Sequence, residues 1–270
     1  MRRAIAVVGL LALAVAGAVF LVGRPGPTPP PAAGPGSLPA TPPTTQLPTA
    51  ALPPPEPVPP ETAPVLPPLA ESDPLVRELA GHLSSQPRLA AALATPDVIR
   101  RFVAAVDNVA DGEVPRVQLP ALAPTGEFRV EERPDGASID PRSYARYDAV
   151  GDLVGSIDAA GSAELYHRLA PLADAAYAEL GYPDRRFDDR LRAALVRLLG
   201  TPLLEGRVAV TPRVLTWRFA DPALERLSPV QKQLVRLGPR NERLVQQKLR
   251  EIAEALGIPP SELPPEVVQP

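Results

Sequence analysis

The sequence predicts an α+β domain that is predominantly α-helical and carries a small antiparallel β-sheet. After residue 69, apolar residues recur at the spacing of one helix face. Five of the predicted helix starts have an Asp, Ser or Thr directly before a proline, which is typical of a helix start. In two short stretches, apolar and polar residues alternate or β-branched residues are frequent, which is typical of β-strands. We therefore place a globular domain at residues 69–258, behind two segments of very different composition.

The first segment, residues 1–24, is predicted to be a transmembrane anchor. Nineteen uncharged residues, 4–22, follow Arg2 and Arg3, and as a helix they would span about 28 Å, close to the thickness of a bilayer. The alternative is a cleaved signal peptide, because Ala14-Val15-Ala16 fits a small-x-small cleavage pattern. The apolar run exceeds the usual length of about 7–15 residues, which favours the anchor.

The charges around this apolar run predict its orientation. Positive residues gather before it, and only Arg24 follows closely. Because basic residues next to a membrane span tend to remain on the cytoplasmic side, we expect a single-pass protein of the cytoplasmic membrane. Its C-terminal domain would lie on the outer, periplasmic side. The predicted membrane partner is the lipid bilayer, contacted through residues 4–22.

The second segment, residues 25–68, is predicted to be a disordered, proline-rich linker. It holds 19 of the 39 prolines of the chain and no basic or aromatic residue. Such a composition cannot bury enough apolar surface to offset the entropy of ordering, and proline clusters favour extended polyproline II conformations. We expect a semi-rigid spacer between the membrane and the domain.

The first half of the domain is predicted to hold helices and a hairpin. A start at residues 72–74 predicts a helix with leucines on one face (Leu75, Leu79 and Leu83). Thr95-Pro96 opens a second helix that ends at Gly112. Residues 127–132 alternate as a strand, a Pro-Asp-Gly turn follows, and residues 137–139 return as its partner.

The second half is predicted to be mainly helical. Helices begin at Asp140, at Asp158 with a kink or split at Pro171, and at Asp188. Short strands follow at 208–210 and 214–219. The last predicted helices start at the X-Pro pairs of residues 221–222, 228–229 and 238–239, and residues 259–270 are predicted to be a flexible tail.

The composition excludes several classes of function. Without cysteine the chain has no disulfide, no thiol nucleophile and no cysteine-based metal site. Its two histidines, His82 and His167, lie too far apart in sequence to suggest a histidine-rich metal centre, so we predict no cofactor and no metal. A net charge of −3 gives no electrostatic case for a nucleic acid partner.

Candidate catalytic residues have simpler structural interpretations. Asp188 and Asp189 are an adjacent carboxylate pair, but neighbours on a helix point about 100° apart and a helix start favours both charges. We interpret them as helix-capping residues, His167 as a surface or packing residue, and the five clustered tyrosines mainly as core. No Gly-x-Ser-x-Gly motif is present.

Five segments together resemble a known family. They are LPPLAESDPLVREL, RRFVAAVDNVADGEVPR, IDPRSYARYD, AYAELGYPDRRFDD and WRFADPALERLSPVQKQLVRLGPRN. In this order they look like the bacterial family called domain of unknown function 3014, over nearly all of residues 66–257. The resemblance implies an envelope protein with an N-terminal anchor and a proline-rich spacer, and it brings no catalytic residue, cofactor or substrate.

Two loops between helices are the candidate binding sites. Gly and Pro fix the turns of residues 181–184 and 238–241, which would leave Tyr182, Asp184, Arg240 and Asn241 free to project, with Trp217 as a further contact. The alternative is that the glycines only end helices while Arg240 and Asn241 act as local caps. Arg, Tyr and Trp are common anchors of interfaces.

These observations favour a non-enzymatic, membrane-anchored envelope protein whose exported domain binds a partner protein or a cell-wall component such as peptidoglycan. A carboxylate-based, cell-wall-modifying hydrolase is the alternative, since location and acidic loops would suit it. A purely structural assembly factor is a third possibility.

Overall fold

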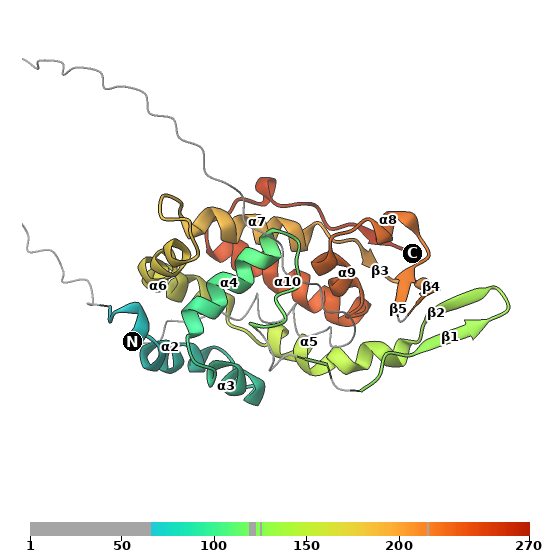
Figure 1. Cartoon of the computed structure of the whole chain (residues 1–270), viewed down its shortest axis with the longest axis horizontal. Helices are drawn as coiled ribbons and strands as arrows, with labels where there is room; N and C mark the ends of the chain where they lie inside the picture. The colour runs from blue at the N-terminus through green and yellow to red at the C-terminus, as the bar shows by residue number, and fades with distance from the viewer. Residues whose placement is uncertain (1–65, 119–122, 125, 215) are drawn as a thin grey trace, which may run out of the picture. The chain divides into compact units, whose positions relative to one another are not determined.

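The computed structural model describes residues 66–118, 123–124, 126–214 and 216–270 (Figure 1). The predicted anchor and all but the last three residues of the predicted linker lie outside the described residues. Within the described part of the chain, no helix has the length and apolar character needed to cross a membrane.

Four helices surround the larger apolar core. They are α4 (Val98–Ala110), α6 (Ala159–Glu179), α7 (Phe187–Leu199) and α10 (Pro239–Ala255), and α10 packs on α6 and α7. The helix predicted after Thr95-Pro96 is confirmed as α4, whose apolar face is buried from end to end, but its N-cap is Asp97 and not Thr95. The helix α6 runs unbroken through Pro171, so of the two predicted alternatives, a kink or a split, the split is wrong.

The N-terminal helices differ from the prediction in their register. The first helix, α2 (Asp73–Ala80), buries Val76 and Ala80, while Leu75 and Leu79 are only half-buried. Two short 3₁₀ segments flank it, η1 (Leu69–Glu71) and η2 (Gly81–Leu83), and an unpredicted helix follows, α3 (Pro87–Leu93). Among the described residues, packing against the larger core begins at Leu66, three residues before the predicted domain boundary.

The small sheet has four antiparallel strands in the order β1-β2-β4-β5. These are β1 (Val130–Arg133), β2 (Gly136–Ile139), β4 (Ala209–Arg213) and β5 (Thr216–Phe219). The predicted hairpin is confirmed, with Val130 opposite Ile139, and it extends away from the helices in Figure 1. Strand β2 also pairs with β4, which joins segments far apart in sequence. The predicted α+β class with a small antiparallel sheet is confirmed.

A second, smaller apolar cluster lies beneath this sheet. Its buried members come from strands, from loops and from two short helices, α8 (Pro222–Glu225) and α9 (Pro229–Val235) (Ile139, Leu204, Val208, Val210, Phe219, Leu224 and Val235). A 3₁₀ segment, η4 (Pro141–Tyr147), leads from β2 into α5 (Asp148–Gly155), and α5 packs on α10. Together η4 and α9 connect the sheet with the helices.

The last twelve residues are not a free tail, which corrects the prediction for residues 259–270. A 3₁₀ turn, η5 (Pro260–Glu262), leads to β6 (Val268–Gln269), which pairs in parallel with β3 (Leu203–Leu204). The backbone N–H groups of Leu203 and Glu205 donate to carbonyls of this segment at 2.9 Å. The backbone of β3 holds the C-terminal segment by these hydrogen bonds. Because backbone groups make them, the pattern of side chains in the sequence does not reveal this pairing.

Candidate functional site

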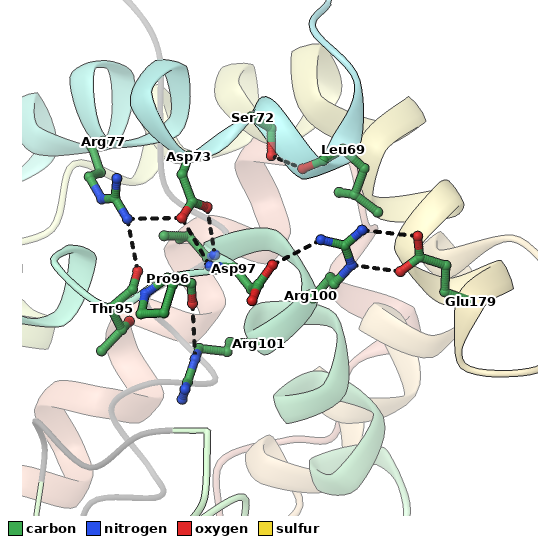
Figure 2. A network of polar contacts seen from close by, with 11 residues as sticks. Leu69, Ser72, Asp73, Arg77, Thr95, Pro96, Asp97, Arg100, Arg101 and Glu179 are labelled. Atoms are coloured by element: carbon green, nitrogen blue, oxygen red, sulfur yellow. Dashed lines mark hydrogen bonds and ion pairs between the residues drawn. The ribbon is translucent and has the colours of Figure 1, made fainter.

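A polar network ties the beginning of the domain to α4 and α6 (Figure 2). The carboxylate of Asp73, on α2, accepts the backbone N–H groups of Asp97 and Val98, each at 2.9 Å. It therefore caps α4 from a different helix. Asp97 itself adopts a left-handed conformation with φ of 57°, and the cap from Asp73 holds this uncommon backbone in place.

Arg100 completes this network on the side of α6. Its guanidinium donates to both carboxylate oxygens of Glu179 at 2.6 and 3.1 Å and to Asp97 at 2.9 Å. The hydrogen bonds from Arg100 lower the pKa of Glu179 below its usual range. Since each charge in this set already has a partner, the network has a structural role.

Tyr182 lies on the core and does not project freely. Its ring stacks on Tyr177, with centroids 4.7 Å apart, and the guanidinium of Arg185 lies 5.6 Å from its centroid. Asp184, in the same loop, is exposed. Tyr177 also meets Phe187 edge to face, so the loop closes over an aromatic cluster. This arrangement favours packing as the role of Tyr182.

The adjacent aspartates do not cap α7 as predicted. The N-cap residue is Arg186, and the N–H of Phe187 donates to Asp174 at 2.8 Å. Asp188 instead accepts the hydroxyl of Tyr166 and pairs with Arg186. Burial, followed by the contact with Asp188, raises the pKa of Tyr166. Both carboxylates still lie in the first turn, where the helix dipole favours them.

Asn241 is buried, which contradicts the prediction that it projects from its loop. Only 1 % of its surface is exposed. Its amide nitrogen lies 3.0 Å from Asp148 and 3.2 Å from the carbonyl of Tyr144, and its oxygen accepts from Arg240 at 2.9 Å. The residue therefore joins η4 and α5 to the start of α10.

Arg240 is exposed and is held by carboxylates of α5. Its guanidinium donates to Asp152 at 2.5 Å and lies 3.7 Å from Asp148. The preceding Gly238 has a φ of 82°, and the ring of Tyr144 occupies the space that a Cβ there would need. Local capping and packing describe this loop better than a free binding surface does.

Glu242 is a buried carboxyl group in the first turns of α10. It is 1 % exposed, and among the described residues its carboxyl group accepts one side-chain hydrogen bond, from the amide of Gln246 at 3.3 Å. That amide also donates to the carbonyl of Thr201 at 2.9 Å. Burial raises the pKa of Glu242 to about 8, so the group is largely protonated at neutral pH.

Trp217 lies on the smaller cluster, half-buried, and two arginines lie against aromatic residues that pack on or in this cluster. The guanidinium of Arg236 lies 4.7 Å from the centroid of Phe219 and donates to the carbonyl of Trp217 at 3.4 Å. The guanidinium of Arg146 lies 5.7 Å from the centroid of Phe128. We call Phe128, Arg146, Trp217 and Arg236 the junction surface.

The five predicted site residues therefore do not form one site. Tyr182 and Asp184 belong to the loop before α7, Arg240 and Asn241 to the α5–α10 contact, and Trp217 to the junction surface. Among the described residues, no hydrogen bond or ion pair joins these three places, and no group of three His, Cys, Asp or Glu residues is suited to hold a metal ion. The neighbouring Arg-aromatic pairs in the sequence were a weak signal of the junction surface.

Comparisons with known proteins give one match. No curated protein and no solved structure matches this chain. A family model described as "Protein of unknown function (DUF3014)" matches residues 98–253, from the start of α4 almost to the end of α10. This range covers more than half of the chain and includes all four strands of the sheet. The chain belongs to this family of proteins of unknown function, DUF3014.

Proposed function

We propose that this protein is a membrane-anchored envelope protein whose exported domain binds a partner protein or peptidoglycan through the junction surface, without catalysing a reaction. The anchor would be residues 1–24, and the proline-rich residues 25–68 would set the distance of the domain from the bilayer. The uncharged run of residues 4–22 and the preceding arginines support this part of the proposal.

The observation that carries the binding role is the distribution of exposed aromatic and arginine groups. Five aromatic side chains are buried in the larger core (Phe102, Tyr147, Tyr166, Tyr177 and Phe187). By contrast, the smaller cluster leaves Phe128, Tyr144 and Trp217 half-exposed, and two arginines lie against it. Aromatic and arginine side chains are the residues most enriched in the energetic centres of interfaces.

The alternative of a carboxylate-based hydrolase gains no support from Glu242. A raised pKa is typical of a general acid, and Glu242 has one. However, a general acid must reach its substrate within hydrogen-bond distance, and this side chain of α10 is only 1 % exposed. Its raised pKa is a consequence of burial alone.

Site-specific crosslinking in intact cells tests the binding role. A photoreactive amino acid at Trp217 should give a discrete crosslinked product, because this side chain lies on the proposed contact surface. The matched control is Glu164, an exposed residue of α6, where we expect no discrete product. Equal labelling at both positions, or at neither, would contradict the proposal.

Two measurements test the anchor. A reporter that is active only outside the cytoplasm should be active when fused after Pro68, whereas activity of a cytoplasm-only reporter would overturn the orientation. Amino-terminal sequencing of the mature protein should find Met1 or Arg2. A start at Gly17 would show that the apolar run is a cleaved signal peptide.

A further inference from the structure

Residues 264–270, which we call the C-terminal strap, lie along the edge of β3. Strand β6, within the strap, pairs in parallel with β3. The backbone N–H of Leu203 donates to the carbonyl of Val267 at 2.9 Å. The backbone N–H of Glu205 donates to the carbonyl of Gln269, also at 2.9 Å. The strap is therefore attached to the domain as an added strand.

The side chains of the strap contribute little to this attachment. Residues 265–270 are all exposed, and Val267 and Val268 keep 46 % and 49 % of their surface in water. Among the described residues, no side chain of the strap takes part in a hydrogen bond or an ion pair. The preceding Leu263, by contrast, packs on the larger core. Because a segment with few buried contacts opens at a low free energy, the strap can leave β3 while the rest of the domain stays folded.

Strand β3 is held in place by α10, independently of the strap. Gln246 of α10 donates to the carbonyl of Thr201, just before β3, at 2.9 Å. Arg243 of α10 forms an ion pair with Glu205, just after β3. Both leucines of β3 are buried. Opening of the strap would therefore leave β3 in position with unpaired N–H groups along its edge, and such an edge readily takes another strand.

The edge of β3 is also shaped to fit the strap. A Cβ at Gly206 would lie 2.6 Å from the carbonyl carbon of Pro270, which is closer than real Cβ atoms approach a backbone. Glycine at this position lets the backbone of the strap come close. Gly206 is therefore part of the docking edge and offers a specific means to disrupt it.

We propose that β3 accepts the strap of a second copy of this chain in place of its own, so that two copies exchange straps and form a dimer. The strap seated on β3 shows which sequence this edge accepts, and a second copy carries the same sequence. Exchange restores between two chains the hydrogen bonds that are lost when the strap opens, which is the general basis of dimers formed by swapping an element.

The exposed surface of the strap also favours association. Two of the five large apolar side chains that are exposed among the described residues, Val267 and Val268, belong to it. Strand β6 has β3 on one side and no strand paired on its other side. Exposed β-branched residues on an open strand edge favour self-association. This inference goes beyond the proposed function, because it uses no residue of the junction surface.

Cysteine trapping tests the exchange, because the chain itself has no cysteine. Leu204 and Gln269 are paired residues of β3 and β6. The Cα atoms of paired residues on adjacent strands lie about 5 Å apart, as a disulfide requires. The full-length variants Leu204→Cys and Gln269→Cys, carrying different tags, are mixed in detergent micelles and oxidised. We expect a disulfide-linked dimer that carries both tags and disappears on reduction.

Two controls accompany this measurement. The chain with both substitutions should form a disulfide, within one chain or between two, which verifies that the two thiols meet; absence of any disulfide would overturn the proposal. Glu132→Cys and Ala137→Cys are a matched pair from the hairpin of β1 and β2, whose short turn opposes exchange. The strap pair should give at least about tenfold more mixed-tag dimer than the hairpin pair, because strand pairing raises the effective concentration of the thiols.

A substitution at Gly206 tests the same edge without cysteine. Gly206→Ala should displace the strap, because the added Cβ meets the backbone of Pro270. Light scattering of the full chain in detergent micelles should therefore find dimers in the wild type and few or none in this variant. Gly81→Ala is the matched control, since no heavy atom lies within 4 Å of its Cβ, and it should keep the dimers. If Leu204→Cys fails to fold, this measurement decides.

Three results would overturn the exchange of straps. The first is a yield of mixed-tag dimer no higher than that of the hairpin pair, and the second is a dimer fraction that Gly206→Ala leaves unchanged. The third is linkage of Gln269→Cys chains mainly to one another, because β6 would then pair edge to edge with β6 of a second copy. Crosslinks from Trp217 in cells are independent of all three and test the proposed function separately.

Discussion

Replacing Glu242 by glutamine should make the domain less sensitive to alkaline pH. Glutamine has nearly the same shape and can keep a hydrogen bond with Gln246, but it does not ionise. In the folded protein, burial raises the pKa of Glu242 from 4.5 to about 8. In the unfolded chain the carboxyl group is in water and keeps its ordinary pKa, so folding takes up a proton between these two pH values.

The sign and size of the effect follow from this difference. The stability that the neutral carboxyl permits is fully present below pH 4.5 and is lost as the pH rises through about 8. The loss amounts to about 1.4 kcal/mol per pH unit, or on the order of 5 kcal/mol over the interval as an upper limit. For a domain of this size, that corresponds to a fall in Tm on the order of 10 °C.

The assay is thermal unfolding of the full chain in detergent micelles from pH 5 to pH 9, followed by the fluorescence of Trp217. Wild type should lose stability over this range, and Glu242→Gln should lose much less. The difference between the wild-type and Glu242→Gln curves isolates the titration of Glu242, because the two proteins share all other titrating groups. The neighbouring Tyr144 does not ionise in this range, since its pKa is raised to about 12. Glu254→Gln, on the exposed side of the same helix, is the control.

Parallel curves for wild type and Glu242→Gln would refute the reasoning. They would mean that the carboxyl group is hydrated, or already ionised, in the folded protein. If Glu254→Gln also abolished the loss of stability at alkaline pH, the overall charge of the chain would be its cause, and not the burial of Glu242.

Three further substitutions test the packing. Gly238→Ala should destabilise by more than about 3 kcal/mol, because it adds a Cβ to a left-handed backbone against the ring of Tyr144; a urea-unfolding midpoint equal to that of wild type would contradict this. Asp73→Ala should lower the free energy of unfolding by about 1–2 kcal/mol, because the cap on α4 is lost. Amide hydrogen exchange should then become faster first at the start of α4; unchanged exchange there would show that Asp73 does not stabilise this helix end. Tyr182→Ala should lower the free energy of unfolding by about 1–3 kcal/mol, because the stack with Tyr177 is lost. If the variant instead kept the wild-type Tm but lost the crosslinks formed from Trp217 in cells, Tyr182 would be a contact residue.

Local signals in the sequence were sufficient to predict several elements. Helices follow the predicted X-Pro starts at Asp140, Asp221 and Ser228, since a side-chain oxygen and a proline fix the backbone within one turn. The hairpin of β1 and β2 is also local, because its turn needs only Pro-Asp-Gly and the φ of 123° that Gly136 adopts. Short-range chemistry determined these features.

Features that depend on distant partners could not be predicted. Asn241 looked like a projecting loop residue, yet its side chain donates to Tyr144 of η4 and Asp148 of α5, which are 97 and 93 residues away in the sequence. Asp188 looked like a cap, but a tyrosine from α6 and Arg186 use its carboxylate. In both cases a polar side chain near a turn has several possible partners, and only packing selects among them.

The sequence by itself determined that this chain has an apolar N-terminal run, a proline-rich segment and a mainly helical domain, because composition and periodicity are properties of neighbouring residues. Only the tertiary structure decided that Glu242 is buried, that Asn241 is buried, and that the last strand pairs with β3. Those properties depend on which surfaces the folded chain removes from water. Burial changes the free energy of a charge by several kcal/mol, and no local pattern records it.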